Sequence, residues 1–154
     1  MYKKMLVPLD TSEYAECVLE HAKEIASARA IPKVVLLTVV ESALRQASLT
    51  YVGEDSAAES EYKAIAAAEA YLGTVKDRLG LATSDVSTAV VVGEPAGAIL
   101  DYIEVNGVDL VVMSTHGRSG VSKWFLGSVV ERVLRRTVAP LFLVPSVACR
   151  VHTS

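Results

Sequence analysis

The sequence predicts an α/β fold built on an open, parallel, five-stranded sheet of order 3-2-1-4-5 with helices on both faces. Short runs rich in Val, Leu and Ile alternate with longer segments whose apolar residues recur every three or four positions. The strand-like runs are almost continuously apolar, which is typical of strands that are covered on both faces. Helices between successive strands require right-handed crossovers, and these produce a parallel sheet.

The first β-α-β unit lies at the N-terminal end of the chain. Residues 4–9 form a short apolar run that we interpret as the first strand. Thr11 or Ser12 follows as the expected N-cap of a helix whose apolar stripe ends at Ala26. Residues 33–40 read Lys-Val-Val-Leu-Leu-Thr-Val-Val and predict an interior strand.

The middle of the chain contains the longest expected connection and the longest expected helix. Residues 41–56 show no clear period, so we expect a lid, a binding loop or disorder there. An Ala- and Glu-rich helix is predicted over residues 57–79, and Gly80 is placed to end it. Residues 85–92 are the third strand.

The C-terminal part repeats the alternation of helix and strand. The third helix begins at Glu94-Pro95, with Pro at its first position, and stops at Asn106-Gly107. Residues 108–113 and 141–144 are the fourth and fifth strands. The expected core stripe of the fourth helix consists of Val129, Val130, Val133 and Leu134.

Length and composition suit one domain, which we place at residues 1–146, with a C-terminal tail over 147–154. The net charge of −3 gives no reason to expect nucleic acid or a membrane surface as partner. No apolar run approaches the ~18 residues of a membrane span. The apolar stretch near Met1 is too short for a signal peptide. We therefore expect a soluble, cytoplasmic protein.

The most informative motif follows the fourth strand. The chain reads Ser114-Thr-His-Gly117, then nine residues, then Gly127-Ser128 at the start of a helical pattern. Such a turn aims a loop at a helix N-terminus, where unpaired N–H groups and the helix dipole favour an anion. With the sheet order above, strands one and four border the crevice in which ligands of such sheets bind, so Asp10 and Gly117 face the same site. The motif predicts nucleotide binding.

These residues carry a resemblance to a known family. The chain resembles the universal stress protein family (UspA-like), in its ATP-binding branch, over nearly its whole length. The matching segments are Met5-Leu-Val-Pro8-Leu-Asp10-Thr-Ser12, Val91-Val-Gly93-Glu-Pro95, Ser114-Thr-His-Gly-Arg-Ser-Gly120 and Trp124-Phe-Leu-Gly127-Ser128-Val129. The family's nucleotide signature is Gly, two residues, Gly, nine residues, Gly, then Ser or Thr. This chain departs from it at the first glycine, which is Ser114.

The resemblance implies a Rossmann-like, adenine nucleotide alpha hydrolase-like fold with ATP as ligand. The nucleotide-binding residues it implies are Pro8, Leu9, Asp10, Val39, Met113, Ser114, Gly117, Arg118, Gly127, Ser128 and Val129. Asp10 would lie near the ribose and phosphates and could hold nucleotide-bound Mg, while Val39 would offer its backbone to adenine. Met113 and Ser114 would flank the ribose, and the glycines with the start of the last helix would enclose the phosphates.

The resemblance also implies a homodimer, paired through the last strand. That strand, Leu141-Phe142-Leu143-Val144, is a short apolar edge that needs covering. Similar proteins often carry a hydroxyl residue two positions after Ser128, where this chain has Val130.

Several site residues allow two interpretations. Asp10 could cap the first helix, contact a metal, or do both. A lone His such as His116 in a loop is more often a hydrogen-bonded surface residue than a catalyst. Arg118 and Lys123 could neutralise phosphate charge or remain solvated. The group formed by Arg132, Arg135 and Arg136 is expected to act mainly through helix-end electrostatics.

The leading hypothesis for function is a regulatory, ATP-binding dimer used in stress response and not an enzyme. One alternative is a slow ATP hydrolase, although the chain lacks a Gly-x-x-x-x-Gly-Lys-Ser/Thr loop and a paired general base. A receiver would need a second acidic residue beside its acceptor Asp, and a flavodoxin would need a glycine-rich loop after strand one. Another alternative is a nucleotide-free dimeric scaffold.

Overall fold

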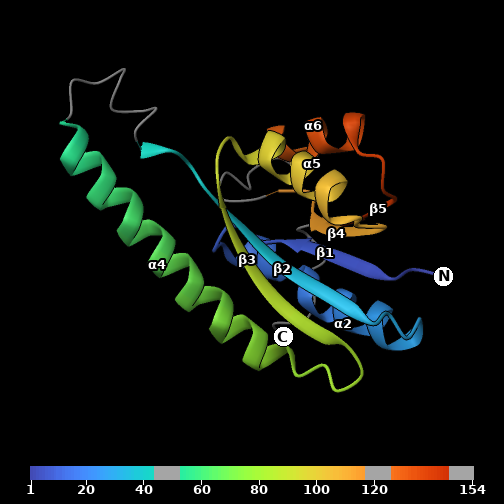
Figure 1. The fold of residues 1–154 in the computed structure, drawn as a ribbon. Coiled ribbons are helices and arrows are strands. Elements are labelled where there is room, and N and C mark those ends of the chain that lie inside the picture. Colours follow the sequence, from blue (N-terminus) through green and yellow to red (C-terminus); the bar gives the residue numbers. More distant parts are fainter. Residues whose placement is uncertain (44–52, 117–125, 146–154) are drawn as a thin grey trace.

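A computed structural model describes residues 1–43, 53–116 and 126–145. Its five strands form one sheet of order β3-β2-β1-β4-β5, and every neighbouring pair is parallel (Figure 1). The strands are β1 (Lys4–Pro8), β2 (Lys33–Val40), β3 (Asp85–Val92), β4 (Leu110–Ser114) and β5 (Leu141–Val144). The predicted fold class and strand order are therefore confirmed.

Helices cover both faces of this sheet. They are α1 (Glu13–Glu16), α2 (Val18–Ala28), α4 (Glu54–Leu79), α5 (Pro95–Asn106) and α6 (Ser128–Arg136). In Figure 1, α5 and α6 lie on one side of the sheet, and α2 and α4 lie on the other. The N-terminal half of α4 extends beyond the sheet, next to the end of β2.

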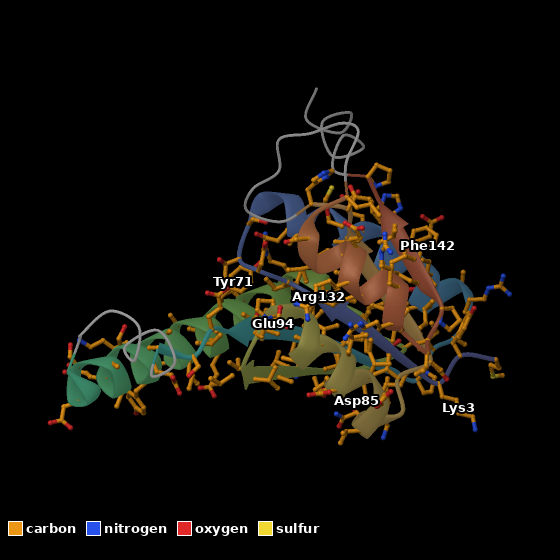
Figure 2. All side chains as sticks on the ribbon, turned by 90° about the horizontal axis from the view of Figure 1, so that it is seen from above. Lys3, Tyr71, Asp85, Glu94, Arg132 and Phe142 are labelled. Atoms are coloured by element: carbon orange, nitrogen blue, oxygen red, sulfur yellow. The ribbon has the colours of Figure 1, made fainter. Side chains whose placement is uncertain are left out.

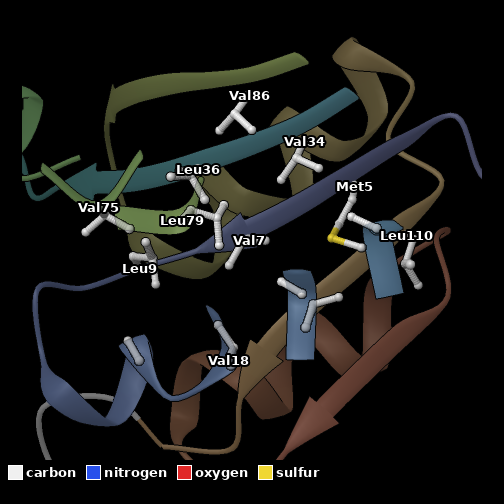
Figure 3. Packing of buried hydrophobic residues seen from close by; sticks show 14 of the residues in the cluster. Met5, Val7, Leu9, Val18, Val34, Leu36, Val75, Leu79, Val86 and Leu110 are labelled. Atoms are coloured by element: carbon white, nitrogen blue, oxygen red, sulfur yellow. The ribbon is translucent and has the colours of Figure 1, made fainter. Parts of the chain in front are cut away.

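The alternation of side chains along the central strand divides the core into two layers. Met5 and Val7 of β1 pack toward α2 and α4, with Val18 and Leu72 (Figure 3 shows this layer). Leu6, between them in the sequence, packs on the opposite face with α5 and α6. A strand buried on both faces needs apolar side chains at every position, which explains the unbroken hydrophobic runs.

The first helical segment is interrupted, contrary to the single helix we expected. Ser12 is the N-cap of α1, and its Oγ accepts a hydrogen bond from the Ala15 amide at 3.1 Å. The segment breaks at Cys17, which keeps helical dihedral angles (φ −54°, ψ −26°). The break is thus a distortion within one helical path, and α2 continues from Val18.

The ends of two helices are set by the backbone conformation of a glycine. Gly80 and Gly107 have φ of 55° and 62° and terminate α4 and α5, as predicted, because glycine adopts this left-handed conformation without strain. The helix α4 starts three residues earlier than expected, at Glu54.

One prediction about the core of α6 is wrong. Leu134 is 45% exposed and does not belong to the core, whereas its neighbour Val133 is fully buried.

Some expectations lie outside the described residues. These are the central part of the 41–56 connection, the residues from Gly117 to Phe125, and the tail over 147–154. Among the helices that the structure describes, none combines the length and apolar character needed to span a membrane.

Candidate functional site

A cleft of about 800 Å³ opens at the carboxyl ends of β1, β2 and β4. Nine of the predicted site residues line it: Pro8, Leu9, Asp10, Val39, Met113, Ser114, Gly127, Ser128 and Val129. The other two, Gly117 and Arg118, lie outside the described residues. The volume falls within the range of about 300–1,000 Å³ that is usual for small-molecule sites. The structure thus brings the described candidates together at one cleft.

The loop after β1 is held in a fixed conformation around Asp10. The Asp10 Oδ1 atom accepts hydrogen bonds from the Ser12 amide (3.0 Å) and from the Ser12 hydroxyl (2.5 Å). Thr11, between them, has a φ of 68°, a strained value for a β-branched residue. Because Ser12 is the helix cap, the Asp10 carboxylate orders the turn and does not itself cap α1. The same carboxylate lines the cleft.

The end of β1 is joined to β2 by two hydrogen bonds that use the amide and the carbonyl of one residue, Leu9. The Leu9 amide donates to the Leu37 carbonyl at 2.8 Å. The buried Thr38 hydroxyl donates to the Leu9 carbonyl at 3.0 Å. These bonds extend the parallel pairing past Pro8, which itself has no N–H to donate. They fix the floor of the cleft where Asp10 begins.

The turn after β4 is closed by the side chain that departs from the family's glycine signature. The hydroxyl of Ser114, which is buried, donates to the His116 carbonyl at 2.9 Å. Nearby, the Thr115 amide donates to the Val144 carbonyl at 3.0 Å and so continues the β4–β5 pairing. Serine at this position therefore stabilises the turn, which a glycine would leave without this hydrogen bond.

Gly127 lies in a close contact within the protein. Its amide donates to the Thr115 carbonyl at 2.9 Å. A Cβ atom at this position would lie 3.3 Å from the same carbonyl oxygen, which is tighter than ordinary packing. The Gly127 amide is thus engaged, and the donors that this segment offers to a ligand begin at Ser128.

The first turn of α6 presents unpaired amides at the edge of the cleft. No side chain caps this helix, and the first intrahelical bond runs from the Glu131 amide to the Gly127 carbonyl. Within the described residues, the amides of Ser128, Val129 and Val130 therefore have no hydrogen-bond partner, as expected for an uncapped first turn. All three residues line the cleft, so the positive end of the helix dipole opens onto it.

An ion pair joins α6 to α5 on the adjacent wall (Figure 2). The Glu94 carboxylate accepts from the Gly97 amide at 2.8 Å and from the Ala96 amide at 3.3 Å. It also accepts from the Arg132 guanidinium at 2.5 Å. Burial by itself would raise the pKa of Glu94, but the two amides and the guanidinium lower it below its usual value. Arg132 therefore does not act only on the dipole at the end of α6, because its ion pair also connects α6 to the N-cap of α5.

The wall formed by α4 was missed by our reading of the sequence. Five of its residues line the cleft: Ser60, Glu61, Ala64, Ala67 and Ala68. Their spacing places them on one face of the helix. The Glu61 Oε2 atom accepts from the Ala43 amide at 3.1 Å, just after β2. The sequence does contain a signal for this wall, namely a stripe of small residues next to the core stripe of the helix. The signal is weak because alanine is frequent throughout the segment.

Binding of a divalent ion at this site would need ligand atoms from a bound nucleotide in addition to protein side chains. In the described part of the chain, no cluster of three or more His, Cys, Asp or Glu side chains is arranged to hold a metal. Mg²⁺ is usually bound through one or two carboxylates together with nucleotide phosphates. The Asp10 carboxylate at the cleft fits that type of site.

Residues 1–145 match the profile described as "Usp: Universal stress protein family". The chain belongs to the universal stress protein family. It is similar to universal stress protein MJ0577 of Methanocaldococcus jannaschii, at 32% identity over 94% of this chain and 95% of that protein. The solved MJ0577 structure superposes with a TM-score of 0.81 and covers 94% of this chain and 96% of its own.

Two further universal stress proteins share the fold at lower identity. UspA from Lactobacillus plantarum superposes with a TM-score of 0.80 at 20% identity, covering 93% of this chain and 97% of its own. A universal stress protein solved in complex with cAMP superposes with a TM-score of 0.66 at 23% identity, covering 94% and 98%. The family predicted from the sequence is confirmed by the profile match over residues 1–145 and by the similarity to MJ0577.

Proposed function

We propose that this universal stress protein binds ATP in the cleft at the carboxyl ends of β1, β2 and β4. The observation that carries the proposal is the uncapped first turn of α6, whose amides at Ser128, Val129 and Val130 open onto that cleft. Unpaired helix amides and the helix dipole together make a favourable phosphate site. The neighbour solved with cAMP is 23% identical and shares the fold alone, and the support for ATP comes from this chain's own residues.

The order of the strands supports the following placement of the nucleotide. The phosphates lie at α6, next to β4, and the ribose lies between Asp10 and Met113, which line the cleft at β1 and β4. The base lies at the end of β2, where Val39 and the alanine face of α4 form the walls. Because β1 separates β2 from β4, these ends are about 10 Å apart, which suits an extended nucleotide.

Mg²⁺ supports this arrangement when it accompanies the nucleotide. The Asp10 carboxylate would hold the ion together with phosphate oxygens, and the ion would offset the repulsion between that carboxylate and the phosphates. Gly117 and Arg118 complete the proposed phosphate site.

The role we propose is a nucleotide-responsive homodimer that regulates partners during stress, without enzymatic turnover. The dimer forms through β5, which is an edge strand of the sheet within the part of the chain that the structure describes. Phe142 on β5 is 43% exposed, and Val138, just before this strand, is 72% exposed. Covering these apolar side chains in a second copy would favour association.

Acid extraction of the purified protein, followed by identification of the released nucleotide, tests the ligand. We expect adenine nucleotide in the extract, or saturable ATP binding by calorimetry when the extract is empty. A protein with neither property would be a nucleotide-free scaffold. Release of phosphate at many turnovers per second would instead show an ATP hydrolase.

A further inference from the structure

We infer that Glu61 selects the base by accepting a hydrogen bond from the 6-amino group of adenine. The inference rests on the proposed nucleotide site and assigns its specificity to a side chain of α4. Glu61 is half-buried and lines the cleft. Glu61 is not part of the glycine signature, which concerns only the phosphate end of the site.

The Glu61 carboxylate is anchored by one oxygen and has the other to offer. Its Oε2 atom accepts from the Ala43 amide at 3.1 Å. In the part of the chain that the structure describes, Oε1 has no protein partner. An anchored carboxylate loses less conformational freedom when it binds a ligand than a mobile one does, so the contact is favoured by preorganisation.

The position of Glu61 places it at the base end of the cleft. Ala43 follows β2 by three residues, so the hydrogen bond holds Glu61 beside the carboxyl end of that strand. The uncapped first turn of α6 belongs to the β4 side, two strand positions away. A nucleotide whose phosphates contact α6 therefore brings its base, and not its phosphates, toward Glu61.

The residues around Glu61 suit a flat ring. Ala64, Ala67 and Ala68 follow it on the same face of α4 and line the cleft with methyl groups alone. A planar base can approach such a wall closely, because no long side chain stands out from it. Glu61 supplies a hydrogen-bond acceptor at the border of this apolar surface.

A carboxylate that faces the 6-position of a purine distinguishes a 6-amino group from a 6-keto group. An ionised carboxylate only accepts hydrogen bonds, so it matches the 6-amino donor of adenine. Hypoxanthine and guanine carry a 6-keto oxygen, an acceptor that the carboxylate repels. With a glutamine in its place, the amide oxygen would take the Ala43 amide and the NH₂ group would face the ligand as a donor. Glu61→Gln should therefore exchange the preference for a 6-amino purine with one for a 6-keto purine.

The experiment measures calorimetric affinities of ATP, inosine triphosphate and purine riboside triphosphate for the full chain. For the wild type we expect ATP to bind about tenfold more tightly than inosine triphosphate, in line with hydrogen bonds to charged groups. Glu61→Gln should remove or invert this ratio. Glu61→Ala should weaken ATP about tenfold and change purine riboside triphosphate, which has no 6-substituent, less than about twofold. Glu59→Gln, on the exposed side of α4 in an ion pair with Lys63, is the matched control and should behave like the wild type.

The outcomes separate this inference from the proposed function. If the wild type binds ATP and all Glu61 variants keep its ATP-to-inosine ratio, the assignment to Glu61 is overturned and the nucleotide site stands. If the wild type binds none of the three triphosphates, the nucleotide site is overturned, and the inference falls with it. Circular dichroism of each variant confirms that the helix content is unchanged.

Discussion

The two ends of the cleft differ in what they offer to a ligand: one offers backbone amides and the other offers side chains. At the α6 end, the backbone amides of Ser128, Val129 and Val130 are the available donors. At the α4 end, the walls are side chains, namely the alanine face and Glu61. Backbone donors recognise charge and depend on where the chain runs, whereas side chains recognise shape and can be changed one at a time. If the proposed function holds, mutations at the two ends should therefore separate the affinity for the nucleotide from the specificity for its base.

The largest effect should come from Gly127→Val, which disturbs the backbone end. The added side chain would crowd the Thr115 carbonyl, already 3.3 Å from a Cβ at this position, and move the first turn of α6. We expect ATP affinity to fall more than about 30-fold while the circular dichroism spectrum is retained. Gly53→Val is the matched control, because Gly53 also precedes a helix in an extended conformation and its Cβ would contact nothing within 4 Å. Unchanged ATP binding by Gly127→Val would place the site elsewhere.

A smaller and more selective effect should come from Ala67→Phe at the side-chain end. The ring would occupy the space proposed for the base and weaken ATP about tenfold, without affecting inorganic triphosphate. Calorimetry with the two ligands measures the difference. Ala66→Phe, on the same helix but away from the cleft, should change neither affinity. Equal weakening of both ligands by Ala67→Phe would contradict the division of the cleft into two ends.

Glu94→Gln tests the support behind the backbone end and is expected to act on stability. Loss of the charged cap should lower the free energy of unfolding at pH 7 by about 1 kcal/mol, as for other helix caps. The pKa of Glu94 is lowered in the folded protein, so its contribution is present above the ordinary value of 4.5 and disappears as the pH falls through the lower folded pKa. In urea unfolding, the free energy of unfolding should therefore differ between variant and wild type at pH 7, and this difference should shrink toward pH 3. A difference that grows at low pH would contradict this assignment.

The smallest effect should come from Ser114→Ala. The Ser114 hydroxyl donates to the His116 carbonyl, so its role here is in the turn. We expect ATP affinity to change less than about threefold, with a small loss of thermal stability. A much larger loss of affinity, with unchanged stability, would show that the hydroxyl contacts the nucleotide directly.

The sheet and its ligand-binding edge could be predicted because they depend on local patterns. Residues 33–40 form β2 with the predicted bounds, since an unbroken apolar run has few other ways to be buried. Pro95, Gly80 and Gly107 marked helix ends through the backbone conformations that these residues favour. The strand order then placed Asp10 and the segment after β4 at one edge.

The parts that could not be predicted depend on contacts between distant segments. The α4 wall is built from alanines, which carry no chemical signature and read equally well as core or as surface. The start of α4 was placed too late because its N-cap, Gly53, forms no side-chain capping bond. The engagement of the Gly127 amide with Thr115 also depends on tertiary packing, since the sequence shows the glycine but not its partner.

A single residue, Thr115, links the proposed phosphate site to β5 at the edge of the sheet. The Thr115 carbonyl accepts from the Gly127 amide, at the start of α6, and the Thr115 amide donates to the Val144 carbonyl, at the end of β5. A shift of that helix on ligand binding would therefore reach β5 through two hydrogen bonds. If subunits pair along β5, occupancy and association would influence each other to the same extent, because such coupling is reciprocal. In the proposed dimer, these two hydrogen bonds would be a short mechanical route by which a bound nucleotide sets the strength of self-association.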